Sequence, residues 1–87
     1  MKIVVQLFGP LRERLGLDDT PLALPDNATA RDALKAFVAA HAEAANYYDA
    51  KTGRTPLMLV VNGERVALDA ALVEGATLML VSPMAGG

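Results

Sequence analysis

The chain has no cysteine and only one histidine, His41. Without cysteine it can form no disulfide, no thiolate nucleophile and no cysteine–metal bond. A single histidine cannot anchor a zinc site or a catalytic triad, so we expect no metal site. The sequence also lacks a glycine-rich loop that ends in Lys-Ser or Lys-Thr, the usual phosphate-binding signature. We therefore expect no bound cofactor and no complete active site within this chain.

Positive charge is scarce, and long apolar runs are missing. A net charge of −2 over 87 residues is unlike the concentrated basic surface that binds nucleic acid. No run approaches the roughly 20 apolar residues that cross a bilayer. The opening MKIVVQLF lacks the apolar region and cleavage site of a secretory signal. We expect one cytoplasmic domain that has neither a nucleic-acid nor a membrane partner.

Five short runs rich in β-branched and other apolar residues predict strands. They cover residues 2–8, 20–24, 57–61, 64–68 and 77–82. Asn62-Gly63 between the third and fourth runs is the strongest short hairpin signal. Between the first two runs, Pro10 and Gly16 bracket a short helical turn.

The best helix signal covers residues 29–42. Thr29 and Asp32 have the spacing of a capping box. Apolar residues then recur at helical spacing and predict one stripe that faces a sheet; they are Ala30, Ala33, Leu34, Phe37 and Val38. His41 extends this stripe, and we interpret it as a half-buried or capping residue. We interpret Tyr47 and Tyr48, in a polar loop over residues 46–56, as packing residues.

The order of these elements predicts the α+β class and the β-grasp (ubiquitin-like) arrangement. We expect a mixed sheet of four to five strands with one main helix packed on one face, and the first and last strands parallel and adjacent. The domain should occupy residues 1–87, with 83–87 as a flexible C-terminal tail.

The strands are too apolar for a sheet with one solvated face. Such strands usually alternate apolar and polar residues, but LMLVV and LMLV do not. If Ile3, Val5 and Leu7 meet the helix, Val4 and Phe8 point outward beside alternate residues of the last strand. This pattern predicts a surface for a protein partner. The alternative is that the loop over residues 46–56 folds across that surface.

The sequence ends in SPMAGG. Pro83 has no N–H, so strand pairing should stop there. The four residues after it could extend about 13–14 Å. Gly86 and Gly87 have no Cβ and could pass through a narrow slot. We expect Pro83, Met84, Ala85 and Gly86 to insert into the site of another protein.

Several motifs together resemble the ubiquitin-like sulfur carriers, most closely the family of molybdopterin synthase small subunits. IVVQLFGPLRERLG is similar to that family's first strand and following turn, including Arg12, Glu13 and Gly16. VEGATLMLVSPMAGG is similar to its final turn, strand and terminal Gly-Gly. Ser82 and Ala76 depart from the family pattern, which has proline and an acidic residue there.

The resemblance implies a mechanism that uses the C-terminal carboxylate of Gly87. A ubiquitin-activating-type adenylyltransferase would spend ATP to adenylate it, and a persulfide donor would convert it to a thiocarboxylate. The sulfur would then pass to cyclic pyranopterin monophosphate inside the large subunit of molybdopterin synthase, in an expected heterotetramer. We assign Val4, Phe8, Arg12 and Met79 to the partner interface.

Three alternatives remain open at this stage. The chain could carry sulfur for thiamine thiazole or another sulfur pathway. It could be a protein modifier that is joined to lysines through Gly87. It could also be a β-grasp interaction module whose Gly-Gly end has no chemical role.

Overall fold

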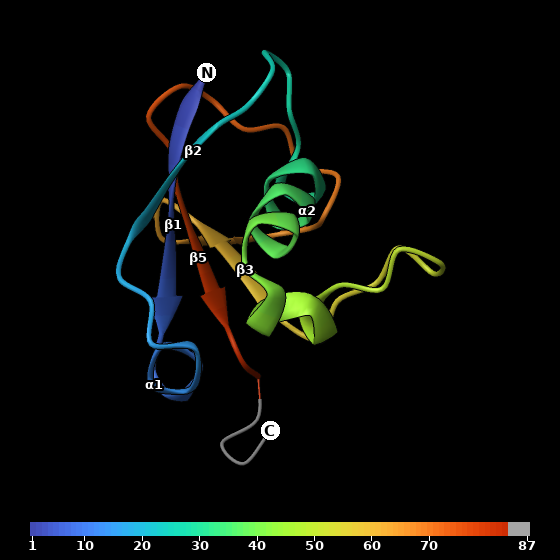
Figure 1. Ribbon diagram of the computed structural model, residues 1–87. Helices are drawn as coiled ribbons and strands as arrows, with labels where there is room; N and C mark the ends of the chain where they lie inside the picture. The colour runs from blue at the N-terminus through green and yellow to red at the C-terminus, as the bar shows by residue number, and fades with distance from the viewer. Residues whose placement is uncertain (84–87) are drawn as a thin grey trace.

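The computed structural model describes residues 1–83 and consists of one five-stranded sheet with a helix against one of its faces (Figure 1). The elements in chain order are β1 (Lys2–Phe8), α1 (Pro10–Leu15), β2 (Thr20–Ala23), α2 (Ala30–Ala40), the 3₁₀ helix η1 (Ala42–Tyr47), β3 (Met58–Val61), β4 (Glu64–Val66) and β5 (Thr77–Val81). The strands lie in the order β2-β1-β5-β3-β4. The predicted α+β class and β-grasp arrangement are confirmed.

Strands β1 and β5 are adjacent in the sheet and run parallel, as predicted. The other neighbouring strands are antiparallel. The turn before β5 is fastened to the start of β1, because the Gly75 N–H donates to the Lys2 carbonyl at 2.8 Å. Gly75 has a φ of +82°, a conformation that glycine adopts without steric cost. This turn therefore sets the register of β1 against β5.

The β3–β4 hairpin forms where Asn62-Gly63 predicts it. Both residues have positive φ, 49° for Asn62 and 88° for Gly63, as the tightest right-twisted hairpins require. The Asn62 side-chain oxygen also accepts from the Thr77 N–H at 3.2 Å. β4 ends at Val66, two residues earlier than predicted.

Helix α2 begins at the predicted capping box. The Asp32 N–H donates to the Thr29 hydroxyl at 3.3 Å, and the Thr29 N–H donates to the Asp32 carboxylate at 2.9 Å. The helix ends at Ala40 with His41 as its cap. In residues 1–83 no helix is both long enough and apolar enough to cross a membrane, since α2, the longest, has 11 residues.

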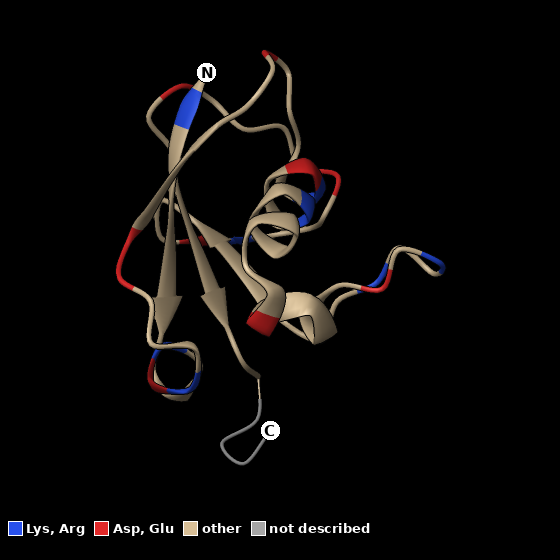
Figure 2. Cartoon of the chain, in the orientation of Figure 1, with Lys and Arg blue, Asp and Glu red and all other residues tan. Residues whose placement is uncertain are grey.

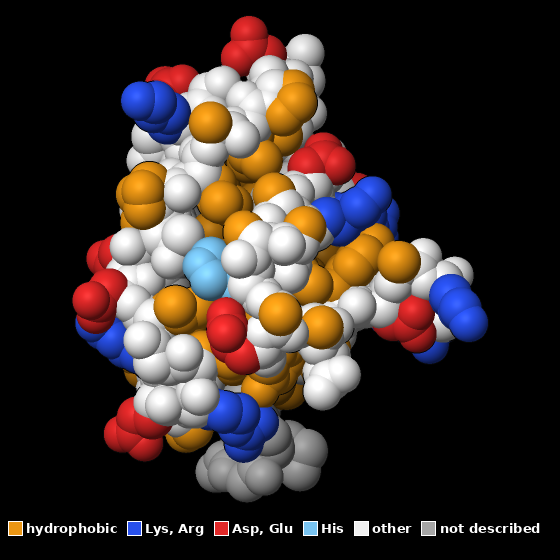
Figure 3. Space-filling view, in the orientation of Figure 1, with side chains coloured by type: hydrophobic (Ala, Val, Ile, Leu, Met, Phe, Trp, Pro, Cys, Tyr) orange, Lys and Arg blue, Asp and Glu red, His pale blue; other side chains and the backbone are white. Residues whose placement is uncertain are grey.

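His41 packs at the end of α2 as interpreted from the sequence. Its ring centroid lies 4.7 Å from that of Phe37. Its Nδ1 lies 3.0 Å from the Phe37 carbonyl oxygen. The imidazole is half-buried and partly visible at the surface (Figure 3). These contacts give His41 a structural role.

The hydrophobic core lies between α2 and one face of the sheet. Phe37 of α2 is 1% exposed and Leu78 of β5 is fully buried. The other buried residues that the sheet and α2 contribute are Ile3, Val5, Leu7, Leu59, Leu80, Ala30, Ala33 and Leu34. Val38, predicted in the same stripe, is only half-buried. Burying one large apolar side chain contributes about 1.5–3 kcal/mol, so this single layer holds the domain together.

The segment after α2 differs most from the prediction. Residues 42–47 form η1, which was expected to be the end of α2 and the start of a loop. Its Ala44 N–H donates to the His41 carbonyl at 2.9 Å, and Ala44 is fully buried. Tyr47 and Tyr48 are half-buried against the core, which confirms their interpretation as packing residues.

Candidate docking face and tail exit

The sheet surface that faces away from α2 is largely apolar. We call it the open face and define it by the outward side chains of β3, of β5 and of the part of β1 that pairs with β5, which are Val4, Gln6, Phe8, Met58, Val60, Thr77, Met79 and Val81. Only Gln6 and Thr77 among them are polar, and the charged Lys2 points outward before this part of β1. Charged residues lie on the helices, on loops and toward the sheet ends, whereas most of β1, β5 and β3 is uncharged (Figure 2). A solvated sheet face normally carries more polar residues than this.

The open-face side chains form rows across the strands. Phe8 lies opposite Val81, which lies opposite Met58. In the next row Gln6, Met79 and Val60 are neighbours. Phe8 is 56% exposed, and the other members are half-buried. The structure thus places Val4, Phe8 and Met79, the three strand residues that we assigned to a partner interface, on one face in three successive rows.

The alternative in which residues 46–56 cover the open face is wrong. The loop lies on the α2 side of the sheet and projects away from it (Figure 1). The Arg31 guanidinium, from the first turn of α2, donates to the Gly53 carbonyl at 3.3 Å. The Arg14 guanidinium, from α1, donates to the Tyr47 hydroxyl at 2.9 Å. These bonds hold the loop to the helices and leave the sheet surface free of it.

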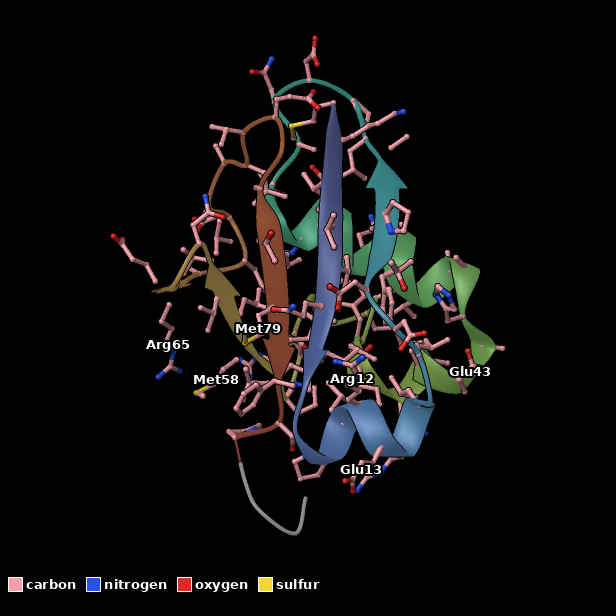
Figure 4. All side chains as sticks on the ribbon, turned by 90° about the vertical axis from the view of Figure 1, so that its left-hand side faces the viewer. Arg12, Glu13, Glu43, Met58, Arg65 and Met79 are labelled. Atoms are coloured by element: carbon pink, nitrogen blue, oxygen red, sulfur yellow. The ribbon has the colours of Figure 1, made fainter. Side chains whose placement is uncertain are left out.

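Arg12 lies on α1, next to the end of β1. The short helix starts with Pro10 and is closed by Gly16, whose N–H donates to the Arg12 carbonyl at 2.8 Å. The Arg12 guanidinium pairs with the Asp18 carboxylate at 3.1 Å while half of its side chain stays exposed. Figure 4 shows Arg12 at the same end of the sheet as Met58 and Met79. Arg12 therefore borders the open face at that end.

The chain leaves the sheet at this same end. β5 finishes at Val81, and Pro83 is exposed. Pairing stops before Pro83, as its missing N–H predicts. The predicted inserting residues Met84, Ala85 and Gly86 and the predicted reactive residue Gly87 lie outside the described residues. Among residues 1–83, no three His, Asp or Glu side chains gather in a group that could hold a metal ion.

Comparison with known families gives a match over nearly the whole chain. The sequence model of the ThiS family matches residues 5–87. This chain belongs to the ThiS family. The resemblance to ubiquitin-like sulfur carriers seen in the sequence is thereby confirmed. Among curated proteins, no sequence gives a significant match.

Solved structures place the ThiS-family chain among ubiquitin-like proteins. SAMP1 from Haloferax volcanii is 30% identical with a TM-score of 0.85, and the match covers 100% of both chains. A Pyrococcus furiosus protein provisionally identified as molybdopterin converting factor subunit 1 is 25% identical with a TM-score of 0.76, covering 97% of this chain and 99% of that one. A complex of subunits 1 and 2 of the molybdopterin-converting factor from Helicobacter pylori contains a chain with 18% identity and a TM-score of 0.65, covering 100% of both.

Some open-face residues of this ThiS-family chain were not named from the sequence. Met58, Val60 and Val81 belong to LMLVV and LMLVS, whose lack of alternation was noted. The period of two along each strand would have identified them once the inward face was fixed. Arg65 on β4 lies in the Gln6 row opposite Val60, and only the strand register reveals its position there.

Proposed function

We propose that this ThiS-family protein is the sulfur-carrier subunit for molybdopterin synthesis in the cytoplasm. The observation that carries the proposal is that the apolar open face extends to the end of the sheet at which the chain leaves toward Gly87. A partner that docks on Phe8 and Val81 would lie next to the residue at which the tail begins. Residues 83–87 would then act as a flexible thread, with Pro83 to Gly86 inserting into the partner and Gly87 as the reactive end.

The chemistry resides on the Gly87 carboxylate. A carboxylate is a stabilised anion, so its oxygen must first become part of a good leaving group. An adenylyltransferase of the ubiquitin-activating type would bind ATP and form the Gly87 acyl-adenylate, releasing pyrophosphate. A persulfide would attack the acyl carbon and displace AMP, and a thiol would then reduce the resulting acyl disulfide to the thiocarboxylate. This chain would supply the acyl group and would bind no cofactor itself.

The thiocarboxylate would donate its sulfur to cyclic pyranopterin monophosphate in the large subunit of molybdopterin synthase. The acid–base groups and the oxyanion stabilisation would belong to that subunit. A large-subunit partner is supported by the Helicobacter pylori complex, in which a chain of the same fold is paired with subunit 2. We propose a heterotetramer of two small and two large subunits. Val4, Phe8, Arg12 and Met79 would contribute to the small-subunit side of the interface.

Intact-mass measurement is the direct test. The purified chain is incubated with the activating enzyme, ATP and a persulfide donor, and the C-terminal peptide is then analysed. Exchange of one oxygen for sulfur, confined to that peptide, is the expected result. Adding the large subunit and cyclic pyranopterin monophosphate should return the carboxylate and yield molybdopterin. An unchanged mass under all conditions contradicts every carrier function.

A protein modifier is the second candidate. It is favoured by the 30% identity to SAMP1, because a second structure from the same organism, 29% identical, is described as small archaeal modifier protein 1. A modifier would accumulate as isopeptide adducts between Gly87 and lysines of other proteins. Peptide mapping of cell extracts separates the two functions. Many adducts together with normal molybdopterin levels in cells that lack the chain would favour the modifier.

A carrier for thiamine thiazole is separated from the leading proposal by complementation. Cells that lack the small subunit of molybdopterin synthase should recover cofactor synthesis when they express this chain. Rescue of a thiazole-carrier deletion in place of this one would assign the chain to the thiazole pathway.

A further inference from the structure

Arg65 is the charged side chain that β4 adds to the apolar surface of β3 and β5. It lies opposite Val60, which in turn lies opposite Met79 of the open face. Within residues 1–83 no carboxylate forms an ion pair with Arg65. Figure 4 shows Arg65 and Met58 directed toward the end of the sheet where β1 and β5 finish. Arg65 is thus an exposed cation with no ion-pair partner among the described residues, and it lies beside the candidate docking surface.

A groove lies next to Arg65 where β3 and β4 diverge. The last paired residues are Leu59 and Val66, and beyond them the two segments separate. Arg65 and Met58 line the resulting groove of about 190 Å³. Its other lining residues are Thr55, Leu57, Leu59, Val66, Ala67 and Leu68. Leu57 and Leu59 are almost fully buried, so polar groups make up much of the accessible surface of the groove, and the Arg65 cation at its border suits an anionic group.

The opposite side of the open face carries anionic groups. The Gln6 amide donates to the Asp19 carboxylate at 3.4 Å. Arg12, on the same side, is already paired with Asp18. Along the Gln6 row the surface therefore runs from the Asp19 carboxylate near β2 to Arg65 on β4. Such polarity favours one orientation of a partner and excludes the reverse, because complementary charges fix register at interfaces.

We propose that Arg65 is a specificity-determining residue of the open face. The large subunit of molybdopterin synthase that docks there presents a carboxylate to the Arg65 guanidinium, next to the groove. This inference rests on the proposed function and adds the chemistry by which the correct partner is recognised. A guanidinium suits this role because its fork of N–H donors matches a carboxylate.

Protection of an exposed strand edge is the competing explanation for Arg65. Charged residues on edge strands prevent sheets from pairing edge to edge, and β4 is at the edge of this sheet. Edge protection predicts that loss of Arg65 increases self-association and leaves the affinity of the monomer for its partner unchanged. Recognition predicts a loss of affinity that follows the sign of the charge.

The test compares Arg65→Glu, Arg65→Ala and Arg65→Lys with the control Arg54→Glu. Arg54 is exposed on the 46–56 loop, on the α2 side, so the control makes the same charge change away from the open face. Affinity of each monomeric variant for the purified large subunit is measured by calorimetry, and its fold by circular dichroism. We expect a loss of about fivefold for Arg65→Ala and about 30-fold for Arg65→Glu. Arg65→Lys should lose less than Arg65→Ala, and Arg54→Glu should change affinity by less than about twofold.

The outcomes separate this inference from the proposed function. If wild-type protein does not bind the large subunit, the proposed function fails. If wild-type protein binds and Arg65→Glu binds equally well, Arg65 is not a recognition residue although the proposed function stands. Equal losses for Arg65→Glu and Arg54→Glu assign the effect to net charge and also overturn the inference. A weaker dependence of affinity on NaCl concentration in Arg65→Ala than in wild type supports it, since the missing contact is ionic.

Discussion

Phe8, the last residue of β1, lies directly opposite Val81, the last residue of β5. The two strands are parallel, so both finish at the same end of the sheet. The most exposed aromatic side chain therefore stands beside the point where the chain leaves toward its C-terminus. A partner that holds Phe8 also fixes the start of the tail, which limits the volume that the tail end can search.

Replacing Phe8 with aspartate should weaken partner binding far more than folding. Phe8 is 56% exposed, so a charge there is hydrated in the free domain and buried only on docking. We expect affinity for the large subunit to fall at least about tenfold, as at an aromatic hot spot. The free energy of unfolding should change by less than about 1 kcal/mol. Calorimetric titration and urea denaturation measure the two quantities.

Val73→Asp is the matched control for Phe8→Asp. Val73 is 63% exposed and precedes Gly75, which is bonded to Lys2 at the far end of β1 from Phe8. The same kind of charge is thus introduced away from the tail exit, and affinity should stay within about twofold of wild type. Equal losses in the two variants would show that the docking surface has been misplaced.

Phe37→Ala should remove much of the stability of the domain. Phe37 is 1% exposed at the centre of the buried face of α2. Truncation of a buried phenylalanine costs about 3–5 kcal/mol, out of a total of ~4–13 kcal/mol for a chain of this length. Phe8→Ala makes the same change at an exposed position and should cost less than about 1 kcal/mol. Urea denaturation of both variants gives the comparison, and equal costs would contradict the assigned core.

Asp32 should make the domain less stable in acid. Its pKa lies below the ordinary value because the carboxylate accepts a hydrogen bond from the Thr29 backbone, with further lowering by the Thr29 hydroxyl, Lys35 and Arg31. A carboxyl group with a lower pKa in the folded state stabilises that state above the unfolded pKa, about 3.9 for aspartate. This contribution is lost as the pH falls through the folded pKa. Thermal denaturation between pH 7 and pH 2 should show a smaller acid loss for Asp32→Asn than for wild type.

Asp69→Asn provides the control for that titration. Asp69 is exposed and, within residues 1–83, takes part in no capping box. Its replacement removes a surface carboxylate and leaves the contribution of the capping box in place. Because Asp32 is itself largely solvated, its effect should be small and visible only as a difference between these two variants. An identical pH profile for both would show that the capping box does not contribute.

Local chemistry made most elements predictable from the sequence. Thr29 and Asp32 specify the start of α2, and Asn62-Gly63 specifies the β3–β4 turn, because each pair satisfies its own backbone. The outward positions of Val4 and Phe8 follow from the period of two along a strand, once Ile3, Val5 and Leu7 are taken as the inward face.

Features that depend on long-range packing could not be predicted in this way. η1 has no strong local signal, and it forms where Ala44 is buried against the core. The position of the 46–56 loop depends on bonds such as that from Arg31 to Gly53, 22 residues apart. Arg65 joins the candidate site only through pairing of β4 with β3. A search for motifs along the sequence detects none of these contacts between distant residues.

Changing the length of the tail should abolish sulfur transfer without affecting the fold. The proposed mechanism places the reacting carbon at Gly87, beyond the exposed Pro83, so deletion of Gly87 or addition of one residue moves it by about 3.3–3.6 Å. A displacement of this size is enough to lose most of the rate when geometry controls the reaction. Gly86→Ala keeps the length of the tail and adds a Cβ. It therefore tests whether the tail must be narrow, separately from how far it must extend. Thiocarboxylate formation is followed by intact mass and stability by thermal denaturation; normal sulfur transfer in either length variant refutes the mechanism at the terminal carboxylate.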